Sequence, residues 1–136
     1  MTGQRALVIG ASGGIGASLV AALTARGAMV EALSRRADGL DITDEASVAA
    51  ALGALEPGFD MVFVATGALQ GADQPPEKSL RALNAAALAD QFAINAIGPA
   101  LILKHGPRLL RRDRRAVFAA LSAKVGSIGD NALGGW

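Results

Sequence analysis

Four glycines, Gly10, Gly13, Gly14 and Gly16, lie between a short apolar run and a stretch of helical composition. Residues 6–9 are typical of a strand buried on both faces, and residues 17–26 favour a helix. The first turn of a helix has backbone N–H groups without intrahelical partners and carries partial positive charge, so glycines there leave room for an anion. A flexible turn is the alternative, but the flanking strand and helix favour a pyrophosphate-binding loop. The residues predicted to form this binding loop are Gly10, Ser12, Gly13, Gly14, Ile15 and Gly16. Among them, Gly10 would allow the tight turn out of the strand, Gly14 the close approach of the phosphates, and Gly16 the packing of the helix on the strand.

A second predicted strand, residues 28–34, ends in Ser34 and is followed by Arg35 and Arg36. In a strand–helix–strand unit, the tip of the second strand faces the ribose of a bound adenosine. An acidic residue there would bind a 2′-hydroxyl group and repel a 2′-phosphate, whereas guanidinium groups match a phosphate dianion. The sequence therefore predicts NADP(H) in preference to NAD(H), with Ser34, Arg35 and Arg36 as contacts. The alternative is a solvated basic turn.

The G-x-x-x-G-x-G spacing, and a later run that contains Asn95, Gly98 and Pro99, resemble the short-chain dehydrogenase/reductase family. The segment from residue 121 to residue 131, with the closing Gly-Gly-Trp, looks like the C-factor and sniffer-type branch of that family. We predict an α/β fold of Rossmann type, a doubly wound parallel sheet of about five strands in three α/β/α layers. Residues 1–136 form a single domain that we expect to be incomplete at its C-terminus. The later predicted strands are a short one near residue 41, residues 60–65 and residues 116–121.

The same resemblance implies contacts to the adenine half of the cofactor. Asp41 and Ile42 match the end of the family's short third strand, whose residues touch the adenine. Ala65, Thr66 and Gly67 stand where the family usually carries Asn-Asn-Ala-Gly, and only the glycine matches well. Without the resemblance, Thr43 or Asp44 is a good N-cap for a helix over residues 45–55. Both interpretations can hold together.

Three polar residues are candidates for catalysis. A helix predicted from about residue 86 to 103 should loosen at Pro99, whose ring presses on the carbonyl group of Asn95. The resemblance implies that this freed carbonyl holds a water of a proton relay, and the alternative is a polar residue that bonds its own backbone. After the last strand, Ala123 occupies the place of the family's active serine, so Ser122 or Ser127 must supply the hydroxyl group.

The family's Tyr-x-x-x-Lys pair would follow Trp136, and the sequence contains no tyrosine. Two hypotheses follow. The chain is the cofactor-binding portion of an NADP(H)-dependent oxidoreductase for a small carbonyl or alcohol substrate, or it is a catalytically inactive NADP-binding sensor or interaction module. In both cases the chain as given is predicted to be inactive. The resemblance also implies a homo-oligomer that pairs through the helix containing Asn95.

Composition excludes several other classes of protein. Hydrophobic residues make up 51% and charged residues 18%, which excludes general disorder. The net charge is +1, and the arginine run at residues 108–115 has no interleaved aromatic residue, so we expect no nucleic-acid partner. The absence of cysteine and the single histidine indicate no metal site and suit a cytoplasmic protein. Asn, Gly or Pro interrupts every long apolar run, so we expect no membrane span.

Overall fold

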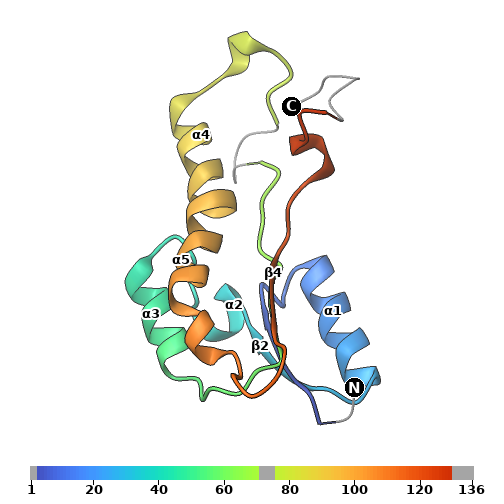
Figure 1. Cartoon of the computed structure of the whole chain (residues 1–136). Coiled ribbons are helices and arrows are strands. Elements are labelled where there is room, and N and C mark those ends of the chain that lie inside the picture. The colour runs from blue at the N-terminus through green and yellow to red at the C-terminus, as the bar shows by residue number, and fades with distance from the viewer. Residues whose placement is uncertain (1–2, 71–75, 130–136) are drawn as a thin grey trace.

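The computed structural model describes residues 3–70 and 76–129, and it has parallel strands alternating with helices (Figure 1). The closing Gly-Gly-Trp and the last two residues of the segment 121–131 thus lie outside the described residues. The strands are β1 (Arg5–Ile9), β2 (Met29–Leu33), β3 (Met61–Val64) and β4 (Val117–Ala120). The α-helices are α1 (Gly14–Ala25), α2 (Arg35–Asp38), α3 (Glu45–Gly53), α4 (Ala85–Phe92) and α5 (Gly98–His105). A π-helical segment, η2 (Ala93–Ile97), joins α4 to α5, and short 3₁₀ turns are η1 (Leu80–Ala82), η3 (Pro107–Leu109) and η4 (Lys124–Gly126).

The described strands form one parallel sheet with the order β2-β1-β3-β4. The chain adds β2 on one side of β1 and then returns to add β3 on the other side, which confirms the predicted doubly wound topology. In the register of the sheet, Leu7 lies between Glu31 and Val62. The strand order therefore reverses between β1 and β3, and the loops after these two strands open at the same edge.

The number of strands differs from the prediction, because residues 40–43 run as coil and turn. The Asp41 carboxylate accepts hydrogen bonds from the Thr43 N–H group at 2.9 Å and from its hydroxyl at 2.7 Å. The Asp41 N–H group donates to the Ser47 hydroxyl at 3.0 Å. Side chains thus bind the polar groups that a fifth strand would offer to β2, and a turn replaces the strand.

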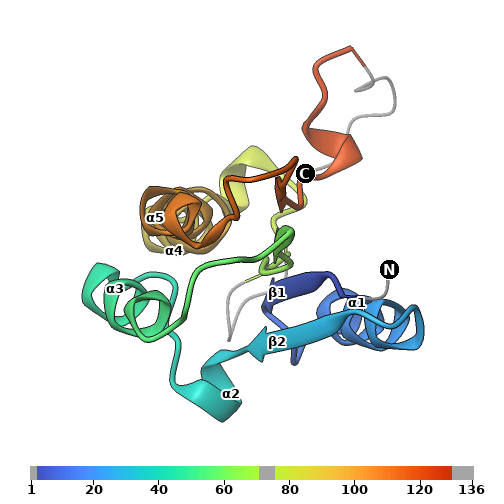
Figure 2. The same cartoon turned by 60° about the horizontal axis from the view of Figure 1, so that its bottom comes forward.

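The central strand β1 is buried on both faces of the sheet, as its apolar run predicts. Successive side chains of a strand point to opposite faces, so Leu7 and Ile9 pack toward α3 and α5 while Ala6 and Val8 pack toward α1. All four side chains are fully buried. Figure 2 shows the resulting layers, with α1 on one side of the sheet and α3, α4 and α5 on the other.

The predicted loosening near Pro99 is confirmed as the π-helical segment η2. Pro99 has no N–H group to donate, and the hydrogen-bonding pattern widens by one residue before the α-helix resumes. Gly98 lies against Ile42, where an added Cβ atom would come within 2.7 Å of the Ile42 side chain. The helix can therefore pass close to the loop that follows β2.

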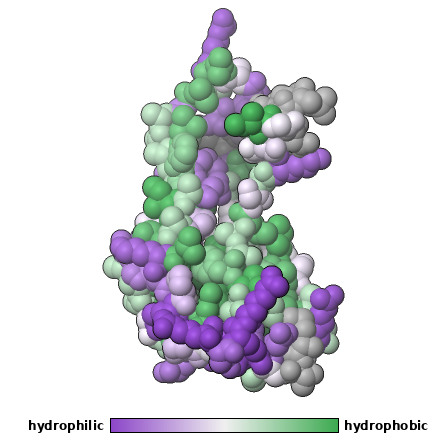
Figure 3. Space-filling model, in the orientation of Figure 1, coloured by the Kyte–Doolittle hydropathy of each residue, from purple (hydrophilic) through white to green (hydrophobic). Residues whose placement is uncertain are grey.

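Because the helix continues through Asn95, Gly98 and Pro99, residues 85–105 form one helical run of 21 residues. By length and composition alone this run could cross a membrane, a criterion that core helices of soluble proteins also meet. The expectation that polar and breaking residues interrupt every such run was therefore wrong. One face of α5 packs on the sheet through the fully buried Ile102, while Figure 3 shows apolar residues along the outer side of α4 and α5.

A buried carboxylate joins the N-terminal ends of the strands. Asp60, just before β3, is 3% exposed and accepts hydrogen bonds from the Arg5 backbone N–H group at 2.9 Å and from Arg111 at 3.1 Å. Arg114 approaches the same carboxylate at 2.7 Å. Burial by itself would raise the pKa of Asp60, but the hydrogen bonds from Arg5, Arg114 and Arg111 outweigh it and hold the pKa below its ordinary value. Arginines of the basic run thus stabilise the sheet from the end opposite to its carboxyl edge.

Candidate functional site

The glycine loop leaves β1 in a tight turn that only glycine fits. Gly10 has a φ of +87°, and a Cβ atom there would lie 2.9 Å from backbone atoms of Ala65 and Thr66. A Cβ atom on Gly16 would lie 2.1 Å from the Gly10 carbonyl oxygen. These two glycines therefore let β1, α1 and the loop after β3 approach one another, as their predicted roles require.

Gly14, the first residue of α1, has different surroundings. A Cβ atom added at Gly14 would have no described heavy atom within 4 Å, apart from those of its chain neighbours and of its own helix backbone. The N-cap of α1 is Gly13, and within the described chain no side chain bonds the N–H groups of the first turn. Free N–H groups, a helix dipole and open space together make a site for an anion, which fits the predicted pyrophosphate.

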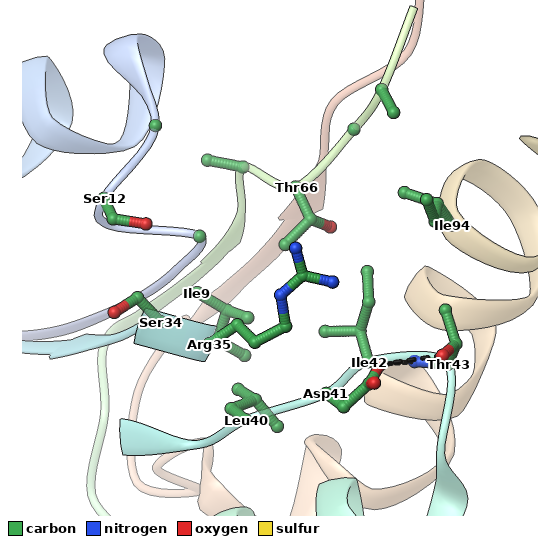
Figure 4. Close-up of a pocket in the computed structure, with 15 residues that line it drawn as sticks. Ile9, Ser12, Ser34, Arg35, Leu40, Asp41, Ile42, Thr43, Thr66 and Ile94 are labelled. Atoms are coloured by element: carbon green, nitrogen blue, oxygen red, sulfur yellow. Dashed lines mark hydrogen bonds between the residues drawn. The ribbon is translucent and has the colours of Figure 1, made fainter. Parts of the chain in front are cut away.

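The first cavity, about 280 Å³, lies beyond the ends of β1 and β2. In Figure 4 the Arg35 guanidinium group extends from the end of β2 toward Thr66. Arg36 is not among the described residues that line this cavity, and Ser34 lines it. The Ser34 hydroxyl accepts a hydrogen bond from the Ala37 N–H group at 3.1 Å, so it caps α2. Two of the three predicted ribose-phosphate contacts, Ser34 and Arg35, therefore line the cavity, and Arg35 is the charged one.

The first cavity is also lined by the two predicted adenine contacts. Asp41 and Ile42 both line the cavity, with Leu40 and Ile94 beside them. The hydrogen bonds from the Thr43 side chain and backbone lower the pKa of Asp41, and the nearby Arg35 charge adds to this effect. Asp41 therefore carries its negative charge at neutral pH. Ile42 is 8% exposed and also belongs to the core, so its position is fixed by packing.

A second cavity of about 660 Å³ opens on the other side of the glycine loop. It shares Gly13 and the segment 65–68 with the first cavity, so the predicted residues Ala65, Thr66 and Gly67 form a wall common to both. Ser122 and Asn95 line the second cavity, together with Ala123. Ser127 follows η4 and is not among the described lining residues. The structure thus brings Asn95 and Ser122 to one cavity and leaves Ser127 outside it.

Asn95 makes contacts that neither sequence interpretation anticipated. Its Oδ1 atom accepts a hydrogen bond from the Ala68 N–H group at 2.9 Å, and its Nδ2 atom donates to the Ala68 carbonyl oxygen at 2.8 Å. Nδ2 also donates to Gln91 Oε1 at 3.0 Å. The side chain therefore binds the loop after β3 rather than its own backbone, and the water-binding role of its carbonyl group stays a prediction.

The sequence did not predict Gln91 or several residues that line the cavities, among them Leu40, Ala68, Leu69, Ile94 and Leu121. Gln91 lies four residues before Asn95, a helical spacing at which amide side chains commonly meet, and this signal could have identified it. Ala68 contributes only backbone atoms, so its residue type carries no such signal. The Thr66 hydroxyl group is buried without a hydrogen-bond partner in the described part of the chain. Within the same residues, no cluster of His, Asp and Glu side chains could hold a metal ion.

Comparisons with known proteins find one matching family and several similar dehydrogenase and reductase structures. The profile of the NAD dependent epimerase/dehydratase family matches residues 6–97. A solved small-chain dehydrogenase is 27% identical over 90% of this chain, with a TM-score of 0.75, and a small-chain dehydrogenase in complex with NADPH is 26% identical over 86%, with a TM-score of 0.70. A carbonyl reductase from Pseudomonas aeruginosa PAO1 is 26% identical over 93% of this chain, with a TM-score of 0.72. The chain spans 61%, 49% and 62% of these three structures, respectively. No curated protein sequence matches the chain.

Proposed function

The chain belongs to the NAD dependent epimerase/dehydratase family, and on this basis we propose that it is the dinucleotide-binding part of an NADP(H)-dependent short-chain oxidoreductase. The family match and the likeness to small-chain dehydrogenases support the resemblance found from the glycine spacing. The membership in the C-factor and sniffer-type branch stays a prediction. When bound, NADP(H) would supply or accept the hydride in a reaction between a carbonyl compound and an alcohol.

The observation that carries this proposal is the uncapped, side-chain-free start of α1 at the point where the strand order reverses. Doubly wound sheets bind nucleotides at this position. The two cavities meet at Gly13 and the segment 65–68, beside this helix start. We assign the pyrophosphate to the first turn of α1, the adenosine to the first cavity and the nicotinamide to the second.

Arg35 supports a preference for NADP(H). Its guanidinium group lies at the end of β2, on the side of the first cavity where the adenosine ribose is assigned. A planar array of N–H donors suits a phosphate dianion, and the carboxylate nearest in the lining, Asp41, accepts hydrogen bonds from Thr43. A similar small-chain dehydrogenase was solved in complex with NADPH, which agrees with this preference.

For the chemical step, we assign Ser122 and Asn95 to the substrate side of the second cavity. Ser122 would orient a carbonyl oxygen, and Asn95 would hold the neighbouring loop and a water in the proton relay. Ser127 is the weaker of the two serine candidates because it is not among the described residues at the cavity. We also propose that the chain self-associates through α4 and α5.

Titration of the chain with NADPH and with NADH, followed by calorimetry, tests the proposed function. We expect NADPH to bind at least about tenfold more tightly, the effect of one charge-assisted phosphate contact. Equal affinities would remove the argument from Arg35. Failure of both nucleotides to bind would contradict the proposed function itself.

A further inference from the structure

The side-chain amide of Asn95 holds the wall that the two cavities share. It bonds both polar groups of the Ala68 backbone, at 2.9 Å and 2.8 Å, in the manner of one strand beside another. Gly67 lies next to this contact, and a Cβ atom there would come within 3.4 Å of Asn95 Oδ1. The position of Ala68, at the end of the segment 65–68, therefore depends on where the Asn95 amide points.

Gln91 restrains that amide from the preceding helical turn. Its Oε1 atom accepts the second hydrogen of Asn95 Nδ2 at 3.0 Å, so both hydrogens of that nitrogen are used. Gln91 belongs to the regular helix α4, whereas Asn95 lies in the π-helical segment. The hydrogen bond thus ties the irregular part of the helix to its regular part. Rotation of the Asn95 amide by 180° would place its Oδ1 atom against the Ala68 carbonyl oxygen and against Gln91 Oε1. Both contacts would then join two acceptors.

The two polar atoms of the Gln91 amide are used unequally. Its Nε2 atom is buried and has no hydrogen-bond partner among the described residues. A buried donor without a partner destabilises a fold, so the contribution of this side chain comes from the oxygen. A glutamate at this position would keep that acceptor, whereas a methionine would keep the length of the side chain and lose it.

From these contacts we infer that Gln91 is a positioning residue for the dinucleotide site, acting through Asn95 on the segment 65–68. The inference about cofactor affinity rests on the proposed function, because it assumes that the nucleotide occupies the two cavities. The inference about the segment itself does not, because the hydrogen bonds exist in the chain without a ligand.

The test compares Gln91→Met and Gln91→Glu in the full chain, with Gln4→Met as the matched control outside the two cavities. Amide hydrogen exchange measured by NMR without ligand should be about three- to tenfold faster at Ala68 in Gln91→Met than in the wild type. Gln91→Glu should restore most of the protection, and Gln4→Met should leave it unchanged. Unchanged exchange at Ala68 in Gln91→Met, or equal loss in both Gln91 variants, would overturn the inference.

The affinity for NADPH is the second measurement. Gln91→Met should raise the Kd by about three- to tenfold, with Gln91→Glu closer to the wild type. If the wild type binds no NADPH, the proposed function fails while the exchange measurement still decides the role of Gln91. If the wild type binds NADPH and the Gln91→Met variant binds it equally well, the role in cofactor positioning is wrong.

Discussion

Gly14 and Gly16 lie two residues apart at the start of α1, yet a side chain would meet different surroundings at each. At Gly16 the Cβ atom would collide with the Gly10 carbonyl oxygen, whereas at Gly14 it would enter open space. The loop spacing predicted both roles, packing for Gly16 and ligand access for Gly14. The structure makes the two roles separable by mutation.

Gly14→Val should abolish dinucleotide binding without unfolding the protein, because the added methyl groups occupy the space assigned to the phosphates. Calorimetry with NADPH and the thermal unfolding temperature give the two measurements. Gly16→Ala is the control for a fold effect and should lower the unfolding temperature. Retained affinity in Gly14→Val would show that the phosphates bind elsewhere.

Arg35 and Arg36 are adjacent and exposed, but only Arg35 is among the described residues at the first cavity. We expect Arg35→Ala to weaken NADPH binding by about tenfold or more and to leave NADH binding nearly unchanged, because only NADPH carries the 2′-phosphate. Arg36→Ala is the matched control and should change neither affinity. An equal loss for both nucleotides would indicate that Arg35 has a general structural role.

The residue types indicated the glycine loop and the arginines after β2, and the family resemblance indicated Asp41 and Ile42. The structure places Arg35, Asp41 and Ile42 at the first cavity. Neither source could show that the Ser34 hydroxyl caps α2 or that the Asn95 side chain binds Ala68. Both outcomes depend on where a neighbouring backbone group lies after folding. Local spacing does not contain that information.

At the scale of elements, strand β1 and helix α1 were predicted closely from the apolar run and the glycine positions. The strand expected near residue 41 was predicted wrongly, because the structure has a turn there. Residues 40–43 have the apolar and β-branched composition of a strand, but the Asp41 side chain forms a turn with Thr43. The helix irregularity at Pro99 was predicted from proline chemistry, but its form as a π-helical segment was not. Local chemistry therefore predicts that an irregularity occurs, and it does not fix which form the irregularity takes.

Asp60 connects three elements, so its loss should affect the stability of the whole sheet. We expect Asp60→Ala to lower the free energy of unfolding by about 3 kcal/mol, because it leaves two arginines without their buried partner. Chemical denaturation measures this change. Asp113→Asn is the matched control, since Asp113 also pairs with Arg111 but is 68% exposed, and it should have little effect.

The same carboxylate predicts how stability depends on pH. Its pKa is lowered in the folded protein, so its contribution is complete above the unfolded pKa and is lost as the pH falls through the folded pKa. The stability difference between the wild type and Asp60→Asn should therefore be largest at neutral pH and shrink below about pH 4. A difference that stays constant from neutral pH to about pH 2 would mean that Asp60 does not titrate with a lowered pKa.

At the scale of the whole molecule, the helical run 85–105 has both buried and exposed apolar side chains. Ile102 on this run is fully buried against the sheet, and the run also carries four exposed apolar side chains, Leu88, Phe92, Ile97 and Leu103. The alternation of strand and helix patterns sufficed to predict the layered architecture. It could not predict how much apolar surface remains on this helix, because that depends on which side faces the sheet.

Phe92 offers the most direct test of self-association, because this aromatic side chain at the end of α4 is 64% exposed. A large aromatic side chain at an interface commonly contributes strongly to binding, so Phe92→Lys should raise the dimer dissociation constant by about tenfold or more. Analytical ultracentrifugation over a range of concentrations measures this constant. Met29→Lys is the matched control, since Met29 is 59% exposed on β2, away from the helix, and should leave the constant unchanged. A wild-type chain that sediments as a monomer at every concentration would contradict the proposed pairing, and an equal effect of both lysines would place the interface elsewhere.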